Sequence, residues 1–418
     1  MFVKGTFIYT PAYGDVKVKE NNYLHIVDGI VDKFYDKIPE EFAGEELVDY
    51  GDNIIIPAFN DLHVHAPQYL NRGLGYDDEL LPWLEKYTFP LEGRFMKEEF
   101  ALKAYTLFLN DLINSGTMRF AAFATIHKHA TKLLMELTNK TGMKAYIGKV
   151  NMDRNSPDYL CEDREKSISD TCELIEWTKN QENVKYILTP RFVPSVTPEL
   201  MRALGDLAEK YNLPVQSHVS ENPGEISWVK SLHPDIESYT AVYREYGLLR
   251  KGQTILAHGI HLTDNERKII KDNNIYIAHC PQSNVDLSSG IMRLDKYVKD
   301  GIKCALASDV SGGHTVAMNR HIITAVEMSK ANTFYNPEDG FVTLKEAFYL
   351  ATKGSGSFFG KVGSFEPDYE FDALVLDTKK QPELIKRSAL EKLWLFLYDG
   401  SNDYIIDRYC DGKIVTPL

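Results

Sequence analysis

The sequence predicts an α/β protein in which a distorted (β/α)8 TIM barrel is joined to a smaller β-sandwich domain built from both chain ends. Three observations lead to this fold class. Short apolar runs and amphipathic stretches alternate eight times between residues 53 and 309, as in a barrel of parallel strands covered by helices. Both ends of the chain have the polar–apolar alternation and glycine-containing turns of antiparallel strands. With 418 residues, the chain is long enough for a barrel of about 250 residues and a second unit.

Residues 1–56 are predicted to form the first part of the small β domain. They contain short strands separated by turns at Tyr13-Gly14-Asp15 and Asp28-Gly29. Residues 361–418 have the same texture, with a strand at 373–376 and a hairpin turn at Asp411-Gly412. We therefore expect the two ends to meet in one domain that packs beside the barrel, and the barrel to take residues 57–360.

The predicted barrel strands are short runs of continuous hydrophobicity, the pattern of buried parallel strands. In chain order they are 54–59, 118–124, 144–150, 186–192, 215–219, 254–257, 275–278 and 303–307. Amphipathic stretches at 97–114, 163–180, 198–211 and 263–273 predict outer helices. Catalytic groups of such barrels lie at the C-terminal ends of the strands, so the residues that follow each run are the candidates for a site.

Composition excludes several classes of partner. The net charge is −13 and no cluster of basic residues occurs, which argues against a nucleic-acid partner. No apolar run reaches the 18 residues that a membrane span needs, and residues 1–13 lack the apolar core of a signal peptide. The five cysteines are scattered, with no Cys-x-x-Cys pair, so neither a disulfide framework nor a thiolate zinc site is expected. We predict a cytoplasmic protein without membrane contact.

Polar residues follow most of the apolar runs in the barrel region. His63 and His65 come after the first run, and their i, i+2 spacing places both imidazoles on one face of a strand. His218 ends the fifth run, His258 follows the sixth and Asp309 follows the eighth. Such a series is hard to explain by packing alone, and we expect these side chains to converge at the mouth of the barrel.

His63, His65, His218 and Asp309 form a candidate set of ligands for one divalent metal. Three nitrogens and one oxygen leave a coordination position for water, and a metal held in this way lowers the pKa of that water toward neutrality. Zn²⁺ is favoured, and Fe²⁺ is the alternative because the ligand types suit both ions. His258 is placed to orient the resulting hydroxide or to bind the metal weakly.

A second His-x-His pair, His127 and His129, is the competing candidate for the metal. It lies at the beginning of a stretch, 126–140, that is predicted to be helical. Residues two apart on a helix point about 200° away from each other, so these two side chains are poorly placed to bind one ion. We expect His63 and His65, not this pair, to be the ligands.

Glu221 is the candidate proton shuttle. It lies three residues after His218, so in a continuing strand it would face away from the metal, and it can reach a metal-bound water only if the chain turns first. The sequence Asn222-Pro223-Gly224 favours such a turn. A carboxylate at this point can carry a proton from water to substrate; the alternative is a structural charge at the beginning of a helix at 226–232.

Two absences narrow the class of metal site. The fourth run ends in Thr189-Pro190-Arg191-Phe192, without the lysine that bridges two metals in binuclear barrel hydrolases, which favours a single metal. The zinc signature of polynucleotide and cytidine deaminases, His-x-Glu with Pro-Cys-x-x-Cys, is also missing.

With these motifs in place, the chain resembles the amidohydrolase superfamily and, within it, the guanine deaminase family. The resemblance covers essentially the whole chain in order. It rests on the segments 63–68 (HVHAPQ), 83–90 (WLEKYTFP), 189–192 (TPRF), 216–222 (QSHVSEN), 257–259 (AHG), 279–284 (HCPQSN) and 308–313 (SDVSGG). Pro67-Gln68, the segment 87–90 and Arg191-Phe192 are the parts most specific to guanine deaminases.

The resemblance implies an activity and residue roles. Members of the family hydrolyse guanine to xanthine and ammonia through attack of metal-bound hydroxide on C2. By resemblance, Glu221 relays the water proton to N3 and Asp309 assists the departure of the amine. Gln68 and Arg191 would bind the purine edge, with Arg191 at O6. The rings of Phe192 and Trp83 would line the substrate site, together with His258.

Other features are left open. Residues 57–60 (PAFN) lack a glycine usual in the family, and Ser308 stands where threonine is common; neither is a ligand position. A related mononuclear hydrolase of adenosine-type compounds or chlorinated triazines is the alternative activity, and a barrel without catalysis is a third reading. Family members are commonly homodimers, so a homodimer is expected. The motion of the segment 68–90 is left open by the sequence.

Overall fold

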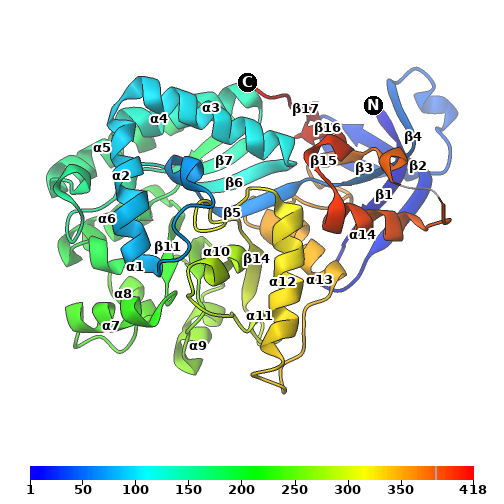
Figure 1. The fold of residues 1–418 in the computed structure, drawn as a ribbon. Helices are drawn as coiled ribbons and strands as arrows, with labels where there is room; N and C mark the ends of the chain where they lie inside the picture. The colour runs from blue at the N-terminus through cyan, green and yellow to red at the C-terminus, as the bar shows by residue number, and fades with distance from the viewer. Residues whose placement is uncertain (382–383) are drawn as a thin grey trace.

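The computed structural model describes residues 1–381 and 384–418 and shows a barrel beside a β domain. In Figure 1 the strands of the blue N-terminal part and the red C-terminal part lie together at the right, and the barrel with its helices fills the rest of the view. The predicted fold class, a (β/α)8-type barrel with a smaller domain from both chain ends, is confirmed. The domain boundaries remain a prediction.

One seven-stranded sheet forms the small domain. Its order is β17-β16-β15-β4-β1-β2-β3, and its strands are β1 (Phe2–Tyr9), β2 (Lys17–Val27), β3 (Ile30–Tyr35), β4 (Leu47–Pro57), β15 (Ala373–Leu376), β16 (Ile405–Cys410) and β17 (Lys413–Ile414). One buried cluster contains side chains from β1, β2, β3, β4, β15 and β16, such as Phe7, Leu24 and Tyr409. The small sheet therefore has a hydrophobic core of its own.

The barrel consists of two four-stranded parallel sheets. Their strands are β5 (Phe59–His65), β6 (Thr117–Phe123), β7 (Lys144–Gly148) and β9 (Val184–Tyr186) in one, and β11 (Val215–Val219), β12 (Thr254–His258), β13 (Tyr276–His279) and β14 (Lys303–Leu306) in the other. A bridge from Leu188 to Val215 joins one seam. At the other seam the Asp309 amide donates to the His63 carbonyl over 2.8 Å. Short strands β8 (Val150–Asn151) and β10 (Thr189–Pro190) pair beside the mouth.

The first barrel strand differs from its prediction. The run at 54–59 was expected to be this strand, but residues 54–57 belong to β4 of the small sheet, where they pair with β15. The barrel strand is β5, and it contains His63 and His65 itself. Pro57 ends β4 and Phe59 begins β5, because proline has no N–H to continue the ladder of a central strand. Hydrophobicity alone did not separate two successive strands that lie in different sheets.

Helices cover the barrel and follow the predicted stretches closely. The bounds are α1 (Leu80–Trp83), α2 (Phe89–Glu92), α3 (Glu98–Asn114), α4 (Lys128–Thr141), α5 (Arg164–Thr178), α6 (Pro198–Tyr211), α7 (Pro223–Leu232), α8 (Tyr239–Glu245), α9 (Asp264–Asp272), α10 (Pro281–Asp286), α11 (Leu294–Lys299), α12 (Met318–Asn332), α13 (Leu344–Tyr349) and α14 (Ala389–Asp399). Helix α9 begins with a capping box formed by Thr263 and Glu266, in which side chains satisfy the free N–H groups of the first turn. Among the described residues, no helix is both long and apolar enough to cross a membrane.

Candidate metal centre and substrate pocket

His63, His65, His218 and Asp309 meet at the mouth of the barrel. His63 Nε2 lies 3.0 Å and His65 Nε2 3.4 Å from Asp309 Oδ1, and His65 Nε2 lies 3.1 Å from His218 Nε2. All four side chains are buried. The strands β5 and β11 and the chain that leaves β14 thus bring together the residues expected to converge.

A hydrogen bond defines which nitrogen of the His218 ring carries the proton. Its Nδ1 lies 2.6 Å from the carbonyl oxygen of Arg191, which can only accept, so Nδ1 carries the proton and Nε2 presents a lone pair. Burial lowers the pKa of His218 and of His65 well below the ordinary value, and neighbouring His63 adds to the effect. Two neutral rings that point their Nε2 atoms at one point, beside a buried carboxylate, have the donor set of a divalent cation.

His258 belongs to the same cluster. One ligand atom from each of His63, His218, His258 and Asp309 lies within 4.8 Å of the others, and His258 Nε2 is 3.7 Å from Asp309 Oδ2. This group contains His258, which was not among the four predicted ligands, and does not contain His65, which was. His65 nevertheless contacts both His218 and Asp309. The described residues could therefore hold a metal through three or more of these five side chains.

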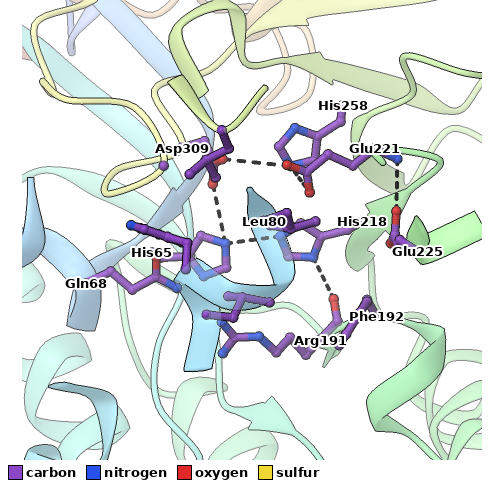
Figure 2. Close-up of a pocket in the computed structure, with 14 residues that line it drawn as sticks. His65, Gln68, Leu80, Arg191, Phe192, His218, Glu221, Glu225, His258 and Asp309 are labelled. Atoms are coloured by element: carbon purple, nitrogen blue, oxygen red, sulfur yellow. Dashed lines mark hydrogen bonds and ion pairs between the residues drawn. The ribbon is translucent and has the colours of Figure 1, made fainter. Parts of the chain in front are cut away.

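Unusual backbone conformations direct three side chains toward this point. Ser220, His258 and Asp309 have φ angles of 47°, 68° and 47°, in the left-handed region that residues other than glycine seldom adopt. Such conformations persist where surrounding structure enforces them, commonly at functional sites. The chain turns at Ser220, immediately after β11, and not at the predicted Asn222-Pro223-Gly224, where helix α7 begins. Because of this turn, Glu221 faces the same side as His218 (Figure 2).

Glu221 is held between two partners. Its Oε2 lies 3.3 Å from His258 Nε2, and its Oε1 accepts a hydrogen bond of 3.1 Å from Ser289 Oγ. Burial raises the pKa of Glu221 well above its ordinary value, and the charges of Glu225 and Asp309 raise it further. A carboxyl with a raised pKa can both accept and return a proton near neutral pH.

A buried carboxylate orders the two strands that carry the ligands. Asp61 accepts from the amides of His63 (3.1 Å) and Ser308 (3.0 Å) and from Ser308 Oγ (2.5 Å). It therefore ties β5 to the end of β14. Ser308 supplies the hydroxyl that this link uses.

Asp309 is the charged member of the cluster. Burial disfavours its ionised form, but the facing rings of His63, His258 and His65 outweigh burial and hold the pKa of the carboxyl below its usual range. Asp309 is thus an anionic ligand candidate.

A cavity opens beside the cluster. It is lined by His65, Gln68, Leu80, Trp83, Leu84, Arg191, Phe192, His218, Glu221, Glu225, His258, Leu287, Asp309 and Gly312. In the view of Figure 2, Gln68 and Arg191 lie on one side of His65 and His218, and Glu221 and His258 lie on the other. The segment 68–90 forms part of the wall, and Trp83 is fixed there by a hydrogen bond from Nε1 to the Leu74 carbonyl (2.9 Å).

Glu92 was missed by the sequence reasoning. Its carboxylate accepts two hydrogen bonds from Arg191 Nη1, of 2.9 and 2.8 Å, and one of 2.9 Å from Gln68 Nε2. Its only local signal was its place two residues after Pro90. Glu225, whose Oε2 accepts from the Glu221 amide (3.0 Å), and Asn284, whose Oδ1 lies 2.9 Å from His258 Nδ1, were also missed as site residues.

The competing histidine pair lies elsewhere. His127 is the N-cap residue of α4, and the His127 and His129 ring centroids are 5.9 Å apart. Neither residue lines the cavity. Burial lowers the pKa of His127 to about 4.

Comparison with known proteins agrees with this geometry. The pattern of the "Amidohydrolase family" matches residues 54–415. A guanine deaminase of Dictyostelium discoideum is 41% identical, with 98% of this chain and 97% of the relative covered; one of Homo sapiens is 34% identical, with 99% and 96% covered. The crystal structure of guanine deaminase from C. acetobutylicum with bound guanine has 45% identity and a TM-score of 0.97, with 99% of both chains covered. The chain therefore belongs to the amidohydrolase family and, within it, to the guanine deaminases.

Proposed function

We propose that the protein deaminates guanine: water and guanine react at this site to give xanthine and ammonia. One observation carries the proposal: a single cavity joins the histidine–aspartate cluster and Glu221 to the polar pair Gln68 and Arg191. The histidine–aspartate cluster and Glu221 suit hydrolysis, and the polar pair Gln68 and Arg191 suits the edge of a purine. The relatives named above support the same activity.

The metal is proposed to be one Zn²⁺ ion, with Fe²⁺ as the alternative. His63, His65, His218 and Asp309 would hold it, because their ligand atoms converge and their rings present lone pairs. When bound, such a cation activates a water molecule as nucleophile near neutral pH.

Glu221 and Asp309 are proposed to move the protons. Glu221 accepts a proton from the attacking water and delivers it to N3 of the ring, for which its raised pKa is suited. Asp309 takes the second proton toward the departing amine. His258, 3.3 Å from Glu221 and 3.7 Å from Asp309, orients the water between them.

Four side chains are proposed to bind the base. Arg191 donates to O6, Gln68 binds the neighbouring edge, and the rings of Phe192 and Trp83 pack on the purine. A site built from buried polar groups rejects analogues that leave those groups unpaired. Adenine, with an amine at position 6, should therefore be a poor substrate.

The test is release of ammonia by the purified, metal-replete protein from guanine, adenine and cytosine in parallel. Turnover of guanine alone is expected. Absence of guanine turnover with metal bound would overturn the substrate assignment, and adenosine-type compounds and chlorinated triazines would be assayed next.

The metal assignment has a separate test. His65→Ala should lose most of the bound metal in elemental analysis, because it removes a ring 3.1 Å from His218 Nε2. The matched control is His127→Ala, which removes the histidine of the competing pair and should retain the metal. A metal-free His127→Ala protein would show that the wrong pair was chosen.

We further propose a homodimer in the cytoplasm, without nucleic-acid or membrane partners. The net charge of −13 disfavours binding to anionic polymers. Phe334 and Tyr335 are neighbours in sequence with 84% and 78% of their surfaces exposed, and exposed apolar groups of this kind are common at protein–protein contacts. Light scattering after gel filtration should give twice the mass of one chain.

A further inference from the structure

Glu92 is a buried carboxylate that contacts two residues of the cavity wall. Glu92 is the last residue of α2, is 1% exposed, and is not among the residues that line the cavity. Its carboxylate contacts Arg191 and Gln68, which do line it. A carboxylate only accepts hydrogen bonds, so the atoms of Arg191 and Gln68 that contact Glu92 must be donors.

The contact with Glu92 assigns the Gln68 amide. The donor to Glu92 must be Nε2, at 2.9 Å, which leaves the carbonyl oxygen Oε1 as the free end of the side chain. No described residue donates a hydrogen bond to Oε1. Gln68 therefore offers Oε1 as an acceptor to a molecule in the cavity, while one of the two N–H groups of Nε2 is used by Glu92.

Arg191 is oriented by the same carboxylate. Its Nη1 makes both bonds to Glu92, and within the described part of the chain Nε and Nη2 have no hydrogen-bond partner. The Cζ of the guanidinium also lies 5.2 Å from the centre of the Phe89 ring. Arg191 therefore offers donors to the cavity, held by an ion pair that is itself buried.

We propose that Glu92 is a positioning residue that sets the hydrogen-bond polarity of the base pocket, acceptor at Gln68 and donor at Arg191. This pattern fits a 6-oxopurine, whose O6 accepts and whose N1–H donates. A 6-aminopurine presents the reverse, a donor at position 6 and an acceptor at N1, and meets unmatched groups at both points. The inference rests on the proposed function and specifies how that site selects its substrate class.

The test measures binding of two non-substrate bases by calorimetry: hypoxanthine, a 6-oxopurine without the 2-amino group, and adenine. The wild-type protein should bind hypoxanthine at least about tenfold more tightly, because buried polar groups left unpaired lower affinity strongly. Binding of adenine within threefold of hypoxanthine by the wild type would overturn the inference. This outcome needs no variant, and it leaves guanine turnover, and so the proposed function, unaffected.

The variant Glu92→Gln tests the residue itself. Its amide can donate as well as accept, so Gln68 and Arg191 are no longer held in one arrangement. We expect KM for guanine to rise about 10- to 100-fold with kcat changed much less, and the preference for hypoxanthine over adenine to narrow. Glu92→Asp, which keeps the carboxylate, should restore part of that preference.

The matched control is Asp111→Asn. Asp111 pairs with Arg72 at 2.5 Å and accepts from Tyr69 at 2.9 Å, so the variant removes a carboxylate from an arginine pair outside the cavity. It should keep the wild-type KM and base preference. A Glu92→Gln protein with normal melting temperature and metal content, and with unchanged KM and base preference, would overturn the role of Glu92.

Discussion

Glu221 is the residue on which the proposed chemistry depends most directly. Glu221→Gln keeps the size of the side chain and can retain the contact with Ser289, but an amide cannot carry the proton. We expect metal content to be unchanged and kcat to fall by about 10²- to 10⁴-fold, the usual contribution of a general acid–base group. Ammonia release and elemental analysis measure both quantities.

The control for this variant is Glu237→Gln, an exposed glutamate paired with Arg244, which should keep wild-type kcat. A Glu221→Gln protein with normal turnover would remove Glu221 from the mechanism.

His321 should make stability depend on pH. It is fully buried in α12, and burial lowers its pKa to about 4 from 6.5. Between these values the unfolded chain binds a proton that the folded protein does not, so stability is lost as pH falls from 6.5 toward 4. By this linkage, lowering the pH from 7 to 5 should reduce the free energy of unfolding of the wild type by about 2 kcal/mol through this residue.

Urea unfolding of wild type and His321→Gln at pH 7 and pH 5 measures this effect. The free energy of unfolding of the wild type, relative to that of the variant, should be lower at pH 5 than at pH 7 by about 2 kcal/mol. An equal difference at both pH values would contradict the linkage.

Single residues were predictable where their type is rare and chemically specific. His63, His65, His218 and Asp309 were found because histidine and aspartate after apolar runs are uncommon, and the structure brings them together. Glu92 was not found because one glutamate among many carries no distinguishing pattern. Its partners lie 24 and 99 positions away, a separation that no local signal spans.

At the scale of elements, helix α6 contains a glycine whose role depends on a neighbouring loop. Helix propensity alone predicts that Gly205→Ala stabilises the protein by about 1 kcal/mol. A Cβ at this position would lie 1.9 Å from the carbonyl oxygen of Tyr246, which is backbone and cannot move aside easily. We expect destabilisation by about 1–3 kcal/mol instead, measured by urea unfolding.

The control is Gly44→Ala, where a Cβ would meet no atom within 4 Å and little change is expected. A stabilised Gly205→Ala protein would show that the loop after α8 yields more readily than its backbone position implies.

Most elements followed from hydrophobic period and end signals. The strand at 215–219 and the helix at 198–211 coincide with β11 and α6, and the start signal at Thr263 is a capping box in the structure. The exception is the end of β4, residues 54–57, which was predicted as part of the first barrel strand. Its apolar residues 54–56 are buried in the small sheet, and burial in either domain produces the same local pattern.

At the scale of the whole molecule, Arg119 links the barrel to the small domain. It lies on β6, and its Nε and Nη2 donate to Asp372, just before β15, over 2.5 and 3.1 Å. Both residues are buried. Asp372→Asn should lower the free energy of unfolding by about 3 kcal/mol, because removing one partner leaves a buried charge poorly compensated.

Urea unfolding measures this change, with Asp368→Asn as the control. Asp368 pairs with Lys361 at the surface, where ion pairs contribute little. An Asp372→Asn protein as stable as the wild type would show that the second carboxylate on Arg119, Glu370, is sufficient to hold the two domains together.

The sequence by itself determined the fold class and the meeting of the chain ends, and it indicated the histidines and the aspartate that converge at the mouth of the barrel. These depend on hydrophobic periodicity and on side chains with specific chemistry, which are readable position by position. Only the tertiary structure decided that Glu92 holds Gln68 and Arg191, that Ser220 turns Glu221 toward the cluster, and that residues 54–57 belong to the small sheet. These depend on contacts between distant segments and on backbone conformation, which appear only when the chain is folded.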